Sequence, residues 1–166
     1  MYPVKLGYPA AIARINMLLA NSHEAEALVT SVFTAEKTLR RTLRQIIVSA
    51  GFISQISDRI IGRLHGLETV KNAWDLYDPN HRKLTDLISA SDWKTIKSAS
   101  EMRNKLVHGE RVYSVQACSQ TASDALLALD NIKNTLDTEY CYSGWATAKA
   151  RRISTLHSDP KVRIAP

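Results

Sequence analysis

The fold is decided by residues 21–51, which read NSHEAEALVTSVFTAEKTLRRTLRQIIVSAG. Asn21 or Ser22 is predicted to cap a long helix here, and Gly51 is predicted to end it after Ala50. Apolar residues within the helix recur at spacings of three, four and seven positions, which places them on one face. These residues are Leu28, Val32, Leu39, Leu43, Ile46 and Ala50. An amphipathic helix of this length needs other helices to cover its apolar face.

Helical spacing of apolar residues continues on both sides of this stretch. Glycines and prolines are too few and too scattered for a β protein. Short connections between long helices instead predict an all-α, antiparallel bundle of about five to seven helices over residues 1–140, followed by a basic C-terminal arm over residues 141–166. Further helices are predicted at about residues 9–20, 53–64, 67–77 and 82–89, from Ser91 or Asp92 to His108, and from a Ser114 cap to about residue 136.

Charge and composition narrow the class of partner. The chain of 166 residues has a net charge of +6, and from Trp145 onward it holds five basic residues against one acidic residue. A basic balance favours an anionic partner, most often a nucleic acid, although a basic tail can also simply increase solubility.

Several other classes of protein are disfavoured. No run of about 18 apolar residues is present, so no membrane-spanning helix is expected. Arg14 and Asn16 interrupt the apolar N-terminal segment, which makes it a poor signal peptide. Two cysteines do not indicate a disulfide scaffold, and a cytoplasmic location is expected. No histidine or cysteine spacing matches a metal site, and no glycine-rich phosphate loop occurs, so neither a metal nor a cofactor is predicted.

Chemistry is concentrated in residues 93–109, WKTIKSASEMRNKLVHG. On a helical wheel Arg103 falls near the middle of the core-facing stripe. A guanidinium there needs a carboxylate, an interface or a bound anion, because an unpaired buried charge is costly. Glu36 and Glu101 are both candidate partners. The apolar residues of this stripe are Ile96, Ala99, Met102, Leu106 and Val107.

Asn104 and His108 lie four positions apart and therefore share one flank of the same helix. Arg103 and His108 diverge by about 140° on an unbroken helix, so a single chain does not bring them together. A two-fold dimer packed along this helix would pair the groups of one protomer with those of the other. A purely structural interpretation is also open, with Arg103 in an ion pair, Asn104 a surface amide and His108 a helix cap.

The segment Arg103-Asn104-Lys105-Leu106-Val107-His108-Gly109 resembles the signature of the HEPN superfamily. That signature is an arginine, commonly followed by a polar residue, and a histidine after four to six positions. The resemblance implies a helical bundle that dimerises through the motif helices. It also implies a metal-independent endoribonuclease of a bacterial toxin–antitoxin, phage-defence or RNA-processing system. Members paired with nucleotidyltransferase antitoxins often carry a tyrosine two residues after the histidine, where this chain has Glu110.

By this resemblance, Arg103 would bind the scissile phosphate and stabilise its developing charge. His108 would transfer a proton to or from a ribose oxygen, and Asn104 would orient one of the reacting groups. Attack by the 2′-hydroxyl would leave a 2′,3′-cyclic phosphate and would spare DNA.

A cluster of basic residues lies on the face of residues 21–51 opposite the apolar stripe. It is predicted to bind the phosphates of an RNA chain. The alternative is an ordinary solvated face. Phe33 borders this cluster and either stacks on a base or packs in the core. Arg111, which follows the motif directly, is also a candidate RNA-binding residue. His65 is expected to cap a helix. A non-catalytic RNA- or protein-binding module, or an antitoxin-like protein, is the alternative function. The cluster comprises Lys37, Arg40, Arg41 and Arg44.

Overall fold

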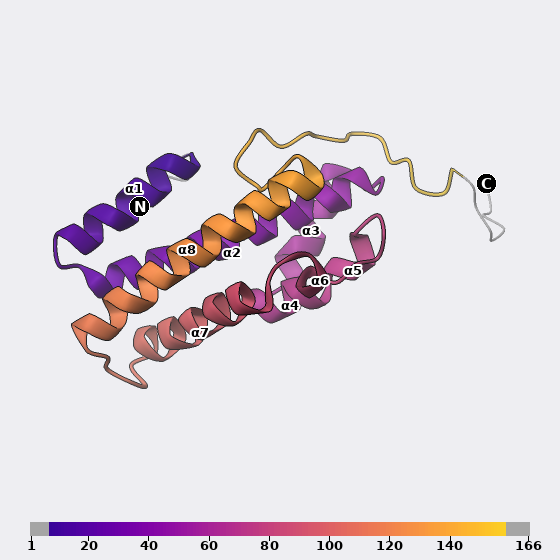
Figure 1. Ribbon diagram of the computed structural model, residues 1–166. Helices are drawn as coiled ribbons and strands as arrows, with labels where there is room; N and C mark the ends of the chain where they lie inside the picture. Colours follow the sequence, from indigo (N-terminus) through magenta and orange to yellow (C-terminus); the bar gives the residue numbers. More distant parts are fainter. Residues whose placement is uncertain (1–6, 159–166) are drawn as a thin grey trace.

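A computed structural model describes residues 7–158, and over that range helices are the only regular secondary structure (Figure 1). The all-α prediction is confirmed. Eight helical segments are present in this range, because the helix predicted over residues 67–77 is divided at Ala73 into two. The segments are α1 (Tyr8–Ala20), α2 (Glu24–Ser49), α3 (Ser54–Arg63), α4 (Gly66–Asn72), α5 (Trp74–Tyr77), α6 (Leu84–Leu87), α7 (Ala90–Val107) and α8 (Val115–Tyr140).

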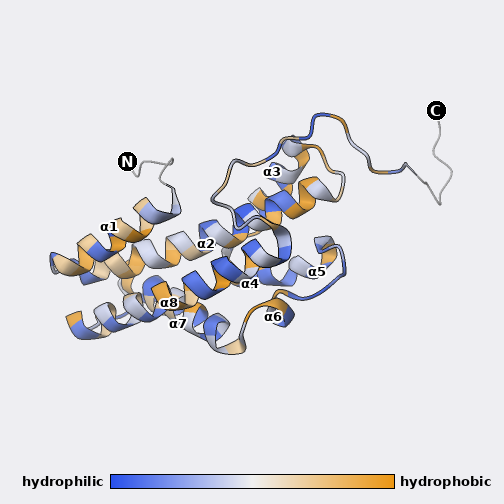
Figure 2. Ribbon diagram, turned by 45° about the horizontal axis from the view of Figure 1, so that its top comes forward, coloured by the Kyte–Doolittle hydropathy of each residue, from blue (hydrophilic) through white to orange (hydrophobic). Residues whose placement is uncertain are grey.

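The four long helices α1, α2, α7 and α8 lie alongside one another, and the short helices α3 to α6 gather at one end (Figure 1). The chain reverses direction between α1 and α2 and again between α7 and α8, as expected for a bundle with short connections. Helix α8 packs against both α2 and α7. Polar and hydrophobic residues alternate along α2, α7 and α8, whereas α1 is largely hydrophobic (Figure 2).

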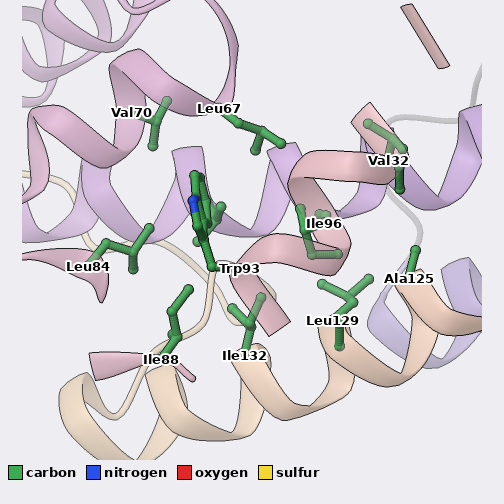
Figure 3. Packing of buried hydrophobic residues seen from close by; sticks show 14 of the residues in the cluster. Val32, Leu67, Val70, Leu84, Ile88, Trp93, Ile96, Ala125, Leu129 and Ile132 are labelled. Carbon is green, nitrogen blue, oxygen red and sulfur yellow. The ribbon is translucent and has the colours of Figure 1, made fainter. Parts of the chain in front are cut away.

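The apolar face of α2 is buried as predicted, with Leu28 and Leu43 fully inaccessible to solvent. Ala50 is an exception, since α2 ends at Ser49 and Ala50 is exposed. The core extends from α2 toward the short helices, where side chains of α4, α6, α7 and α8 surround Trp93 (Figure 3). Burial of apolar area in this cluster is the main favourable contribution to folding.

Two of the predicted helix caps are wrong. Helix α2 begins after His23 rather than after Asn21 or Ser22, and Ser22 lies in the left-handed region with a φ of 59°. Helix α7 begins two or three residues earlier than predicted, because Ser89 is the cap and its hydroxyl accepts a hydrogen bond from the Asp92 N–H. Ser114 caps α8 as predicted, with its hydroxyl accepting from the Ala117 N–H at 3.1 Å.

The C-terminal arm contacts α2, the α2–α3 turn and the start of α3 as far as Leu156. Trp145 donates its indole N–H to the Thr38 hydroxyl of α2 at 2.9 Å, and Arg151 exchanges two hydrogen bonds with Ser54 at the start of α3. Gly144 has a φ of 87°, and a Cβ there would lie 2.9 Å from the Thr38 carbonyl oxygen. Only glycine permits this approach. The charged residues Asp159, Lys161 and Arg163 lie outside the described residues.

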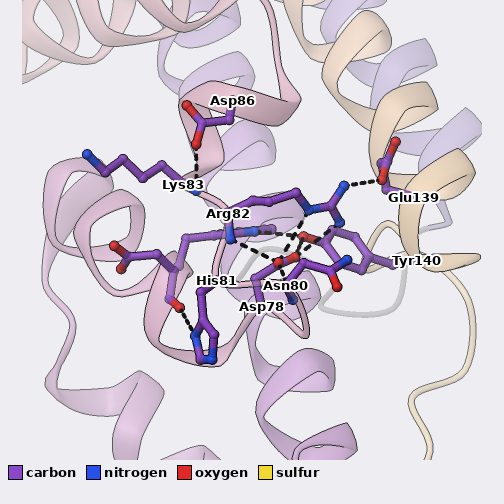
Figure 4. Close-up of polar contacts among 10 residues, drawn as sticks. Asp78, Asn80, His81, Arg82, Lys83, Asp86, Glu139 and Tyr140 are labelled. Atoms are coloured by element: carbon purple, nitrogen blue, oxygen red, sulfur yellow. Dashed lines mark hydrogen bonds and ion pairs between the residues drawn. The ribbon is translucent and has the colours of Figure 1, made fainter.

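A buried polar cluster closes the end of the bundle near α5 and α8 (Figure 4). The Asp78 carboxylate is fully buried and accepts hydrogen bonds from the Tyr140 hydroxyl, the Arg82 guanidinium, and the backbone N–H groups of Asn80 and Arg82. Burial alone would raise the pKa of Asp78, but these donors outweigh it and hold the pKa at about 2. Arg82 is held in turn by Glu139.

Among residues 7–158, no helix combines the length and the apolar character needed to span a membrane.

Candidate functional site

Helix α7 carries the motif residues, and only its first part is buried. Trp93, Ile96, Ala99 and Ser100 face the core, whereas Val107 at the last position of the helix is 59% exposed. The last two turns of the helix are only partly buried, with Met102 and Leu106 still packed against the core. The motif lies on this partly buried end of the helix, where a groove-lining side chain can reach solvent.

Arg103 crosses from α7 to α2, where its Nη2 donates to the Glu36 Oε1 at 2.6 Å. The two side chains are 24% and 22% exposed. The helical wheel predicted that Arg103 lies near the middle of the core-facing surface of α7. In the structure it is half-buried at the edge of that surface. Of the two carboxylates considered from sequence, Glu36 is the partner.

The guanidinium of Arg103 is only partly satisfied. A guanidinium can donate several hydrogen bonds, yet the contact with Glu36 is the single one that Arg103 makes within residues 7–158. Its Nε is buried without a hydrogen-bond partner. The remaining donors leave it able to bind a further acceptor, and a phosphate fits the geometry of a guanidinium.

Asn104 is exposed and lines the same hollow as Arg103. His108 follows α7 directly as its C-cap residue and is exposed, but it does not line that hollow. Gly109, with a φ of 69°, turns the chain away from the helix. Within one chain the structure thus brings Arg103 and Asn104 to one surface and leaves His108 one turn beyond it.

Two hollows meet beside Arg103 and form one groove. The first, of about 420 Å³, lies between α7 and the start of α4 and includes Arg103 and Asn104. The second, of about 490 Å³, runs along α2 and α3. They share Glu36, His65 and Gly66, so the groove is continuous from α7 to α2. We call this surface the α2–α7 groove.

The charge of the α2–α7 groove is uneven. Six basic and three acidic side chains line it, and the acidic ones all border the hollow next to α7. Lys97, at that end, pairs with Glu68 at 3.2 Å. The excess of positive charge lies along α2. A polyanion would therefore be attracted to the α2 end of the groove.

The basic cluster on α2 is less solvent-exposed than predicted. Arg40 donates to the carbonyl oxygens of Ile61 and Leu64 at the end of α3, and Arg44 pairs with Asp58. Lys37 lies over the Trp145 ring, 4.6 Å from its centroid, and partial burial together with the charge of Arg41 lowers its pKa. These contacts stabilise the fold. Arg41 forms no ion pair with any described residue.

Arg111 and Phe33 flank these features. Arg111 is exposed in the turn after α7, and its guanidinium lies 5.1 Å from the centre of the Tyr113 ring. It does not line the α2–α7 groove. Phe33 does line it and is 53% exposed, so it is not a core residue.

His65 belongs to this groove although sequence reasoning treated it as a helix cap. It immediately precedes α4, but its side chain makes no capping hydrogen bond, and the imidazole is exposed. Its place beside Arg103 depends on how α4 packs against α2 and α7. No local pattern in the sequence predicts that packing.

Comparison with family models, with curated proteins and with solved structures found no match to this chain. The motif Arg103-Asn104-x3-His108 and the geometry around it therefore carry the functional argument.

Proposed function

We propose that the protein is a HEPN-type, metal-independent endoribonuclease that acts as a homodimer, in a bacterial toxin–antitoxin, defence or RNA-processing setting. The observation that carries this proposal is the placement of Arg103. Its guanidinium is half-buried, donates one hydrogen bond to Glu36, and lines a groove that continues along the basic side of α2.

In this proposal RNA enters along α2, where Arg41 and its neighbours attract the phosphates. Arg103 binds the scissile phosphate, and Asn104 orients it or the ribose. The 2′-oxygen attacks phosphorus, the bond to the 5′-oxygen breaks, and a 2′,3′-cyclic phosphate and a 5′-hydroxyl are formed. His108 takes part in the proton transfers. The nucleophile belongs to the substrate, so the protein needs none of its own.

A homodimer is supported by apolar side chains around the end of α7. Val107, Val112 and Val115 are 59%, 89% and 64% exposed, and all three lie near the α7–α8 turn. Val115 is the first residue of α8, and its side chain faces solvent. Contact between two copies through these residues would bury this surface and bring His108 of one copy toward the groove of the other.

The decisive experiment is cleavage of a labelled single-stranded RNA in EDTA by the wild-type chain and by R103A, N104A and H108A. The first and last variants are expected to lose on the order of 10²-fold or more in rate. K105A, an exposed substitution on the same helix, is the matched control. The wild type should leave DNA of the same sequence intact and should yield a cyclic phosphate.

The Arg103–Glu36 ion pair favours one rival, a non-catalytic module that binds RNA or a partner protein such as a toxin. For that rival, RNA stays intact with every variant, and R103A changes only stability or binding. If neither the wild type nor any variant cleaves the RNA, the nuclease proposal is rejected and the binding module is retained.

A further inference from the structure

Cleavage by 2′-hydroxyl attack needs two proton transfers. One group removes the proton of the 2′-hydroxyl, and another delivers a proton to the departing 5′-oxygen. The motif supplies one histidine in each chain, His108, and it lies outside the hollow that holds Arg103. In the proposed homodimer each α2–α7 groove receives one His108, from the other copy, so the second proton transfer at that groove requires another group.

His65 occupies that position. It lines both hollows of the groove, one of which it shares with Arg103 and Asn104. It is the single histidine among the described residues that does so. His23 lies 3.9 Å from Glu26 outside the groove, and His81 is hydrogen-bonded to the Asp75 carbonyl oxygen.

The imidazole of His65 has no structural task within residues 7–158. Only the backbone of His65 takes part in local structure among these residues, where its carbonyl oxygen accepts a hydrogen bond from the Thr69 hydroxyl at 2.7 Å. No side-chain hydrogen bond caps α4, and no described carboxylate pairs with the ring. An exposed imidazole that faces a groove and lacks a partner is available to substrate.

We infer that His65 is a catalytic proton-transfer residue of the proposed ribonuclease. This inference rests on the proposed function and assigns a residue outside the motif. As the 2′-oxygen bonds to phosphorus and the bond to the 5′-oxygen breaks, His65 either accepts the 2′ proton or donates a proton to the 5′-oxygen. His108 of the second copy performs the other transfer. No water, metal or oxidant is consumed in this step.

The test uses the full chain and a single-stranded RNA at saturating protein, under single-turnover conditions in EDTA. We expect H65Q to lower the cleavage rate by about 10²-fold, the usual contribution of a general acid or base. Binding of a non-cleavable 2′-O-methyl RNA and the melting temperature should not change. The matched control is H23Q, which replaces an exposed histidine outside the groove and should cleave like the wild type.

Chemical rescue adds a signature that a structural role would not give. Free imidazole should restore cleavage by H65A in a saturable manner, but it should not restore cleavage by R103A. Cleavage by H65Q at the rate of H23Q would overturn the inference, and so would a loss explained entirely by weaker RNA binding or a lower melting temperature. If the wild type itself does not cleave, the proposed function has failed. If the wild type cleaves, R103A does not, and H65Q is fully active, the proposed function stands and only the catalytic role of His65 is rejected.

Discussion

Two arginine–carboxylate pairs in this protein have opposite surroundings. Asp78 is fully buried beside Arg82, and side-chain and backbone donors from three residues surround its carboxylate (Figure 4). Glu36 is half-buried beside Arg103 and receives one hydrogen bond from it, and the buried Arg103 Nε has no acceptor among residues 7–158. The first pair lies where α5, α6 and α8 meet, and the second lines the α2–α7 groove.

The difference separates a structural pair from a pair with binding capacity left over. A buried charge is tolerated when all its hydrogen bonds are made, and such a network holds the elements that contribute to it in one arrangement. A guanidinium with unused donors at a solvent-accessible groove can still form a favourable hydrogen bond with a further acceptor, which a fully hydrogen-bonded buried pair cannot. Loss of the Asp78 cluster should therefore affect folding, whereas changes at Glu36 should affect binding.

The largest expected effect follows from removal of the buried carboxylate. Asp78→Ala leaves Tyr140 and two backbone N–H groups without their acceptor, and should lower the free energy of unfolding by about 3 kcal/mol. Urea denaturation followed by circular dichroism measures this. Glu139→Ala removes the more exposed carboxylate that pairs with Arg82 and serves as the control, with a far smaller effect. Equal losses from both variants would contradict the structural role of Asp78.

Acid should weaken the same cluster. The pKa of Asp78 is about 2 in the folded protein, below its value near 4 in an unfolded chain. The stabilisation is therefore complete above about pH 4 and is lost as the pH falls toward 2, with a total of roughly 2 kcal/mol. Unfolding free energies measured across this range for the wild type and Asp78→Asn provide the test. The variant should lack this component of the pH dependence, and parallel curves would argue against it.

A smaller change is expected at the groove. Glu36→Gln removes the negative charge that occupies Arg103 but keeps a polar side chain of similar size. Stability should fall by about 1 kcal/mol or less, as for a partly exposed ion pair. RNA affinity should rise, because the charge of Arg103 is no longer neutralised by Glu36. Fluorescence anisotropy with a non-cleavable RNA measures this, and weaker binding by the variant would show that Glu36 contacts the RNA favourably.

The smallest effect concerns the basic side of α2. Arg41 forms no ion pair with a described residue, whereas Arg44 is held by Asp58. Arg41→Gln should therefore reduce the slope of log affinity against log salt by about one, as expected for the loss of one phosphate contact. Arg44→Gln should change the slope less and the stability more. Identical salt slopes for wild type and Arg41→Gln would remove Arg41 from the RNA path.

The sequence predicted the helical architecture more closely than the site. Periodicity located α2 and α7 because amphipathic helices carry their own signal, and Ser114 was recognisable as a cap from local chemistry. The depth of Arg103 was overestimated because a helical wheel cannot show that α7 is only partly buried near its end. The Asp78–Tyr140 hydrogen bond and the position of His65 were missed, since both depend on the packing of distant elements.

The packing of α2 against α8 also has a kinetic consequence. Helix α2 ends at Ser49 and its main partner α8 begins at Val115, and the contacts of Trp145 and Arg151 span still longer separations. Closing such long loops costs entropy before any packing energy is gained. This topology gives a higher contact order than a bundle in which only neighbouring helices touch, so its folding should be slower. Until α8 docks, the apolar stripe of α2 stays open to water and to other chains.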